Sequence, residues 1–202
     1  KNALMLFGST SPSYLILQSL DMANKLLATT FPEKLEKTVQ NVDGLKKALS
    51  GAGYTLFGNE PLKLTISSKT YGYTGYELSQ ILEKENIYCE FYDPDFVVMM
   101  FTPEISEDEF KYIEKVFLNI KRLSPIDEKP PVLKGAERVL STHDAISSAS
   151  EIIPVEDAEG RVLASISVNC PPAIPIVVCG EKIDNDAIKM FKYYGIEKCE
   201  VI

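Results

Sequence analysis

Hydroxyl side chains crowd residues 9–14, whose sequence is Ser-Thr-Ser-Pro-Ser-Tyr. Ser and Thr cap helix N-termini, and proline is favoured at the first helical position, so this segment predicts a helix over 9–29 with Ser11 as its N-cap. The unpaired N–H groups of a helix start attract anions, and nearby hydroxyls add donors for a phosphate. Two interpretations therefore stand, helix capping alone or a phosphate site formed by Ser9, Thr10 and Ser11.

A second unusual segment is the proline-rich stretch 171–175, which is followed by Gly180 and Glu181. Prolines fix the backbone, so the stretch is either a structural crossover between apolar strands or the wall of a site. Glu181 directly follows a glycine and can present a carboxylate to a cationic group. A solvated glutamate in a turn is the alternative interpretation.

The residue types do not support a catalytic triad, a metal site or a nucleotide-binding motif. The single histidine, His143, lies in Ser-Thr-His-Asp, and neighbouring helix residues point in different directions, so no catalytic triad and no catalytic residue is expected. One histidine and scattered cysteines exclude a zinc or non-haem iron site, so no metal is expected. The sequence also lacks the glycine-rich motifs that bind nucleotide phosphates. The four cysteines, at 89, 170, 179 and 199, fit buried reduced thiols.

The composition is that of a globular protein. Among 202 residues, 45% are hydrophobic and 25% charged, and the longest apolar run, 96–101, is far shorter than the ~20 residues of a membrane span. The net charge of −8 and only three arginines argue against nucleic acid as a partner. No signal peptide opens the sequence, so a cytoplasmic protein without a membrane partner is expected.

Hydrophobic periodicity predicts the elements that position these segments. A second helix starts at Pro32 and ends at Gly51, and a small α+β layer follows. Strands are expected at 62–66, 87–91 and 96–101, with a turn at Asp93–Asp95. A helix opens at Thr74 or Gly75, and a capping box of Ser106 and Glu109 starts another.

A change in composition divides the chain after this layer. Residues 123–135 hold three prolines and one glycine and predict a linker. Beyond it we expect a smaller unit with strands at 162–168 and 176–179, a helix from Asp184 to Gly195, and an edge strand at 198–201.

Four motifs resemble the bacterial ornithine/lysine/arginine decarboxylases, which are pyridoxal-phosphate enzymes with the aspartate-aminotransferase fold. The motifs are residues 7–21, 155–161, 171–175 and 180–183, in the family's order. The resemblance implies an α/β (α+β) fold. Residues 1–50 would be the helical end of a large domain and a connector, 51–122 an aminotransferase-like small domain, 123–135 a linker, and 136–202 the family's C-terminal domain.

The resemblance also implies a site. In the family, a hydroxyl at the positions of Ser9, Thr10 and Ser11 reaches the cofactor phosphate of the neighbouring subunit, so the partners are a second copy in a homodimer or larger homo-oligomer and a basic amino acid. Glu181, Pro172 and Ala173 would line the substrate site. Ala173 stands where the family pattern has glycine.

One departure bears on activity. The family's cofactor lysine lies upstream in a Ser-x-His-Lys type motif, whereas Asp144 follows the lone His143 here. The resemblance therefore implies the C-terminal portion of a lysine, arginine or ornithine decarboxylase, which needs the N-terminal pyridoxal-phosphate-binding part and is inactive alone. Two alternatives are a non-catalytic regulatory or scaffolding subunit and an unrelated binding domain, since molybdopterin-insertion proteins carry a string similar to 155–164.

Overall fold

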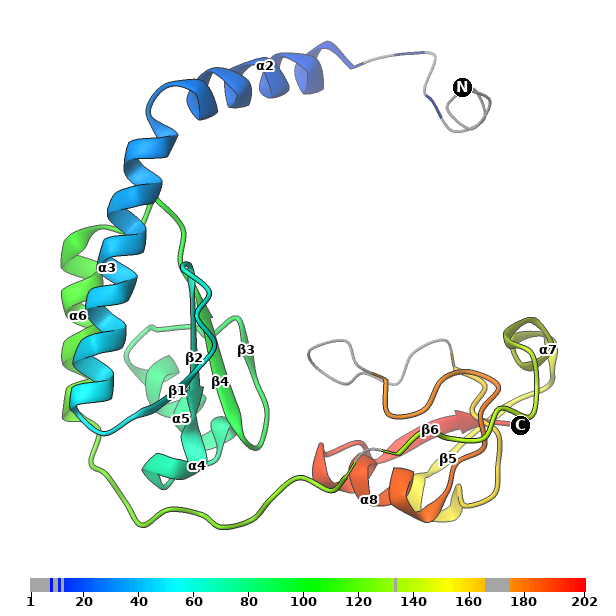
Figure 1. The fold of residues 1–202 in the computed structure, drawn as a ribbon. Coiled ribbons are helices and arrows are strands. Elements are labelled where there is room, and N and C mark those ends of the chain that lie inside the picture. The colour runs from blue at the N-terminus through cyan, green and yellow to red at the C-terminus, as the bar shows by residue number, and fades with distance from the viewer. Residues whose placement is uncertain (1–7, 9–10, 12, 133, 166–174) are drawn as a thin grey trace.

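The computed structural model describes residues 8, 11, 13–132, 134–165 and 175–202 (Figure 1). Helix α2 (Tyr14–Ala28) comes first and α3 (Phe31–Gly51) follows it. Pro32 lies in the first turn of α3, where its missing N–H leaves no bond unmade. Helix α2 buries no residue, and Figure 1 shows it extending away from the rest of the chain.

A four-stranded antiparallel sheet forms the centre of the first domain, which we call the sheet domain. Its strands are β1 (Thr55–Phe57), β2 (Lys63–Ser67), β3 (Phe91–Tyr92) and β4 (Phe96–Met100), in the order β1-β2-β4-β3. In the central pair, Leu64 lies opposite Met99 and Ile66 opposite Val97. All four of these side chains are buried, so one face of the sheet carries the core.

Helices cover that face. They are α3, α5 (Gly75–Lys84) and α6 (Glu107–Asn119), while the short α4 (Ser68–Tyr71) continues directly from β2. Leu49 of α3, Leu78 of α5 and Phe117 of α6 are fully buried in the same core as the sheet residues. The apolar spacing of each helix therefore serves one shared interior.

A connector leads to a second domain. Residues 121–132 form no helix or strand, but Leu123 N–H donates to Tyr71 O and Ile126 N–H donates to Lys69 O, so the connector runs along the sheet domain. We call residues 136–202 the C-terminal domain. It contains α7 (Thr142–Ser147), β5 (Glu151–Pro154), a 3₁₀ turn at Val155–Asp157, α8 (Asn185–Tyr193) and β6 (Lys198–Val201).

The C-terminal domain has its own core. Strands β5 and β6 pair antiparallel, and α8 packs its apolar face beside them. The largest fully buried side chains of this core are Phe191, Leu163 and Ile183. The mixed helix and sheet content confirms the predicted α+β class. No helix within the described ranges is long and apolar enough to cross a bilayer.

Several local predictions are confirmed. Thr74 and Ser106 both start helices through complete capping boxes, and Asp184 caps α8 by accepting from Ala187 N. Asp93 closes its turn by accepting from the backbone N–H groups of Asp95 and Phe96. The free cysteines 89, 179 and 199 are buried or half-buried, whereas Cys170 lies outside the described residues.

Four local predictions are wrong. The strand expected at 162–168 does not form in its described part, where Val162 and Leu163 make only isolated bridges, and residues 166–168 lie outside the described residues. Helix α2 starts at Tyr14, because Ser13 has an extended backbone and takes the N-cap position expected for Ser11. Residues 87–90 form no strand, since Ile87 N–H bonds back to Leu82 O and prolongs the end of α5. Residues 176–179 form no strand, since 176–177 lie in a bend and Cys179 begins a turn that the Glu181 N–H closes on Val178 O.

Candidate functional site

The hydroxyl-rich segment precedes α2. Ser9 and Thr10 lie outside the described residues, and Ser11 is exposed in a bend. Ser13 is the N-cap of α2, but its side chain makes no capping hydrogen bond. The first turn contains no acidic residue. A helix start without a side-chain cap or a local negative charge can receive an anion on its N–H groups.

Glu181 belongs to a tight turn of the C-terminal domain. Gly180 has φ +89°, and a Cβ there would lie 2.4 Å from Leu140 O, so glycine is required. The Glu181 Oε2 atom accepts from Val178 N at 2.8 Å, and Arg138 Nη2 lies 4.0 Å from Oε1. The side chain is only 17% exposed. Glu181 is thus held in its turn, and Pro172 and Ala173 lie outside the described residues.

The segment around the single histidine, His143, forms an ordinary helix start. Ser141 caps α7 by accepting from Asp144 N at 3.1 Å, and its hydroxyl donates to Asp144 Oδ2 at 2.6 Å. His143 lies exposed in the same helix, as the sequence predicts. A single short helix therefore accounts for the whole cluster, and no triad geometry arises.

The structure reveals a polar cluster that sequence reasoning missed. Lys69 of α4, Asp95 of the β3–β4 turn and Tyr193 at the end of α8 meet between the two domains. The Lys69 Nζ atom lies 3.1 Å from Asp95 Oδ1 and donates to Tyr193 Oη at 2.7 Å. The Tyr193 hydroxyl donates to the Asp95 carboxylate at 2.8 Å. From the sequence, Asp95 is expected only in a turn, and the wide separation of the three residues along the chain gives no signal of their contact.

Electrostatics keep the Lys69 amine charged. Burial alone would lower the pKa of Lys69, but hydrogen bonds with Tyr193, Asp95 and Glu128 outweigh burial and raise it. Burial raises the pKa of Tyr193 to about 12, so its phenol stays protonated at neutral pH. Among the described residues Lys69 is the one buried lysine. As a permanent ammonium it is unsuited to act as a nucleophile.

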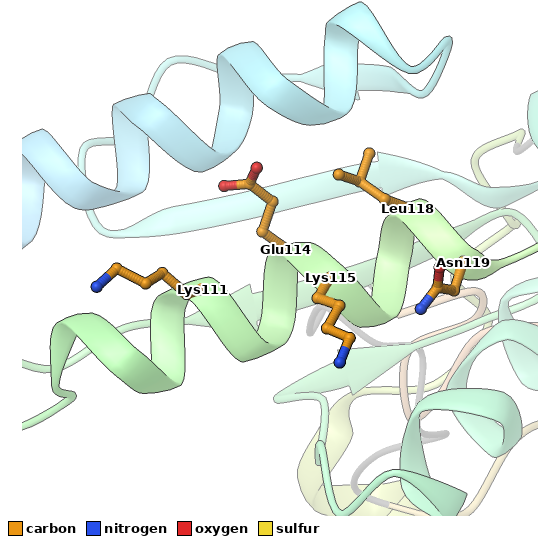
Figure 2. A pocket seen from close by; sticks show the side chains of 5 residues that line it. All are labelled: Lys111, Glu114, Lys115, Leu118 and Asn119. Atoms are coloured by element: carbon orange, nitrogen blue, oxygen red, sulfur yellow. The ribbon is translucent and has the colours of Figure 1, made fainter.

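Surface cavities do not coincide with these groups. A shallow pocket of about 280 Å³ is lined by five residues that all come from α6. Figure 2 shows how their side chains lie along this helix. A larger groove of about 790 Å³ lies over the open face of the sheet, lined by Phe57, Phe96 and Met100 among others. Asp93 reaches this groove, but its Oδ1 atom is committed to the turn. Neither cavity contains Ser11 or Glu181.

Comparison with known proteins gives a consistent result. Residues 135–198 match the family described as Orn/Lys/Arg decarboxylase, C-terminal domain. The chain is 30% identical to the arginine decarboxylase of Bacillus subtilis over 93% of its own length and 42% of that protein. It is 29% identical to the arginine decarboxylase of Bacillus anthracis over 95% of its length and 43% of that protein. The chain thus spans less than half of these relatives.

Solved structures share the fold. The constitutive lysine decarboxylase of Escherichia coli superimposes on the whole chain with a TM-score of 0.69 at 14% identity, and the match covers 45% of that protein. Lysine decarboxylase A of Pseudomonas aeruginosa gives the same TM-score at 15% identity, over 96% of this chain and 39% of its own. At this identity the likeness establishes the fold and no more.

Proposed function

Because the chain matches the C-terminal part of the Orn/Lys/Arg decarboxylase family, we propose that it is the C-terminal part of a pyridoxal-phosphate-dependent decarboxylase of a basic amino acid. The observation that carries the proposal is the alignment with arginine decarboxylases over more than nine-tenths of the chain, which includes both domains. Arginine is the favoured substrate, since relatives near 30% identity are named for it. Lysine and ornithine remain the alternatives, and a cytoplasmic homo-oligomer is the expected assembly.

The start of α2 fits the phosphate of the cofactor. Ser11 lies three residues before Tyr14, and the first turn offers N–H groups without a competing carboxylate. We assign Ser11, with Ser9 and Thr10, to the phosphate of the neighbouring subunit's cofactor. When bound, pyridoxal phosphate withdraws the electrons left behind as CO₂ departs. The contribution of this chain is to hold and orient the phosphate.

Glu181 fits the distal cation of the substrate. Its carboxylate is largely buried and is fixed by Val178 N, and Arg138 at 4.0 Å leaves it only partly neutralised. A guanidinium or ammonium that reached this turn would find a desolvated, oriented acceptor. The family resemblance adds Pro172 and Ala173 to the residues that line the substrate site, and both lie outside the described residues.

The chain by itself is proposed to be inactive. The family's cofactor lysine lies in a Ser-x-His-Lys type motif upstream of the matched part, and in this chain Asp144, not lysine, follows the single His143. The N-terminal cofactor-binding part is therefore the partner that this proposal requires. A regulatory or scaffolding subunit of the same fold would need the same partner without adding to catalysis.

An antibody raised to this chain tests the proposal. Immunoblots of the source cells should show a polypeptide well above 22.5 kDa, and arginine decarboxylase activity should be depleted with it by immunoprecipitation. In that polypeptide, Glu181→Gln should raise KM for arginine roughly tenfold to a hundredfold. Glu159→Gln, at an exposed position of the same domain, is the matched control. A band at 22.5 kDa with no associated decarboxylase would instead support the scaffolding alternative.

A further inference from the structure

The two domains have separate interiors. The core of the sheet domain is built from α3, α5, α6 and the sheet, whereas that of the C-terminal domain is built around α8 and β6. No side chain in the described part of the chain belongs to both cores. Apolar packing therefore gives each domain its stability but does not fix the angle between them, and polar contacts across the boundary become decisive for orientation.

Tyr193 carries such contacts. Its hydroxyl accepts from Lys69 Nζ at 2.7 Å and donates to Asp95 at 2.8 Å, and Lys69 also lies 3.1 Å from Asp95 Oδ1. The other acceptors of the ammonium belong to Glu128 in the connector, whose backbone oxygen lies at 3.1 Å and whose Oε2 atom lies at 3.2 Å. All three Lys69 donors thus have acceptors, and they join the sheet domain, the connector and α8 at one point.

Because the cluster is buried, its hydrogen bonds depend on how the contributing residues are oriented. The Lys69 side chain is 6% exposed and that of Asp95 is 12% exposed, so this pair, which belongs to the sheet domain, is largely shielded from water where Tyr193 meets it. Hydrogen bonds of this kind weaken steeply once distance or angle departs from the optimum. A rotation of α8 would break both hydrogen bonds of the Tyr193 hydroxyl, whereas Lys69 would keep Asp95 and Glu128 as partners. Within this cluster, Tyr193 therefore carries the contact that depends on the orientation of the domains.

The turn that holds Glu181 moves with α8. Val139 and Leu140 donate their N–H groups to Gly180 O, and Gly160 N–H donates to Ile183 O, so the turn is bonded into the C-terminal domain on both sides. Helix α8 begins four residues after Glu181 and ends at Tyr193. A change in orientation of α8 against the sheet domain therefore displaces the Glu181 carboxylate.

We propose that Lys69, Asp95 and Tyr193 position the C-terminal domain, so that the Tyr193 hydroxyl sets where the Glu181 turn lies relative to the sheet domain and to the substrate. The catalytic part of this inference rests on the proposed decarboxylase function. The three residues act through Glu181 and are positioning residues. The domain-orientation part stands on the contacts alone.

The orientation is tested on this chain. Tyr193→Phe removes only the phenolic oxygen and keeps the aromatic ring at position 193. The Lys69–Asp95 pair stays in contact in this variant. Backbone ¹⁵N relaxation should give one rotational correlation time for both domains in the wild type and a shorter, separate value for the C-terminal domain in the variant. Tyr88→Phe removes the same atom at a position that is 74% exposed and should change nothing.

A common correlation time in Tyr193→Phe would overturn the positioning role, as would separate values already present in the wild type. Unchanged amide chemical shifts for Phe191 and Val97 would show that both cores remain folded in the variant. A milder variant, Asp95→Asn, keeps a hydrogen-bond acceptor for Tyr193. The correlation times of its two domains should differ less than those of Tyr193→Phe.

The catalytic consequence is tested in the decarboxylase that carries this sequence. Tyr193→Phe should raise KM for the amino acid roughly threefold to tenfold and leave cofactor affinity unchanged, because the phosphate-binding segment is not attached to α8. A lower kcat with unchanged KM would contradict positioning of Glu181. If the wild-type enzyme does not decarboxylate basic amino acids, the proposed function fails, and the relaxation experiment still decides the orientation.

Discussion

The helices α2 and α8 lie near opposite ends of the chain and both carry large apolar side chains. Helix α8 has nine residues, and four of them are buried in the core of the C-terminal domain, namely Ala187, Ile188, Met190 and Phe191. In α2, fifteen residues bury none, and Leu15 is 79% exposed. Apolar residues occur on several sides of α2, whereas in α8 they share one side and charged residues occupy the other.

The difference shows that hydrophobic spacing predicts a helix without identifying what covers it. An uncovered apolar helix surface of this kind is typical of an interface. The proposed function supplies an occupant for α2, namely the cofactor-binding part or a second subunit, because α2 follows directly on the proposed phosphate-binding residues. Four experiments, each of which compares two variants, can break or sharpen this comparison.

The largest effect is expected at the centre of α8. Phe191 is fully buried, so Phe191→Ala should lower the free energy of unfolding by about 3–5 kcal/mol through lost burial and the cavity that remains. Urea denaturation followed by circular dichroism measures the change. Leu17→Ala in α2, where the side chain is 48% exposed, is the matched control and should change it by less than about 0.5 kcal/mol. Equal losses in the two variants would contradict the contrast between the helices.

A glycine marks how closely a covered helix packs. At Gly75, the first residue of α5, a Cβ would lie 2.1 Å from Asp93 O and 2.4 Å from Phe96 O, and backbone oxygens cannot move aside cheaply. Gly75→Ala should therefore cost about 1–3 kcal/mol in thermal or urea unfolding. Gly44 of α3 has no atom within 4 Å of its Cβ position, so Gly44→Ala should stabilise by about 0.5–1 kcal/mol. The opposite signs are the test, and a gain from Gly75→Ala would refute the close approach.

The N-caps of α6 and α2 differ in their hydrogen bonds, so they can be compared in the same way. The Ser106 side chain accepts from Glu109 N and its N–H donates to Glu109, so Ser106→Ala should cost about 1 kcal/mol. The Ser13 side chain makes no capping bond at α2, and Ser13→Ala should be neutral within about 0.5 kcal/mol. Thermal melts of the two variants decide this. A loss at Ser13 equal to that at Ser106 would mean that α2 is capped in solution.

The sequence predicts much of this fold and little of its assembly. Capping residues such as Thr74, Ser106 and Asp184 are local signals, so three helix starts follow directly from spacing. The stretch 176–179 has strand-like composition but forms no strand, because the Glu181 side chain and backbone bond to Val178. The Lys69–Asp95–Tyr193 cluster could not be predicted, since it depends on how two domains meet. For the candidate site, Ser11 and Glu181 were identified from residue types and family resemblance, whereas the bonds that hold Glu181 follow only from the structure.

The smallest effect is expected on α2, and it is the sharpest test of the contrast. Leu15, Ile16 and Met22 are 79%, 62% and 65% exposed, so folding of this chain removes little of their surface from water. Replacing all three with Gln should change the free energy of unfolding by less than about 0.5 kcal/mol, because hydrophobic stabilisation follows the area buried. Ile188→Gln in α8 places the same amide in a core and should cost several times more. A loss above about 2 kcal/mol in the triple variant would show that α2 is covered within this chain, and its role as a partner surface would then lose its basis. If stability is unchanged, sedimentation velocity of the proposed full-length decarboxylase with the same three changes should show weakened subunit association, because the proposal assigns the uncovered surface of α2 to the partner.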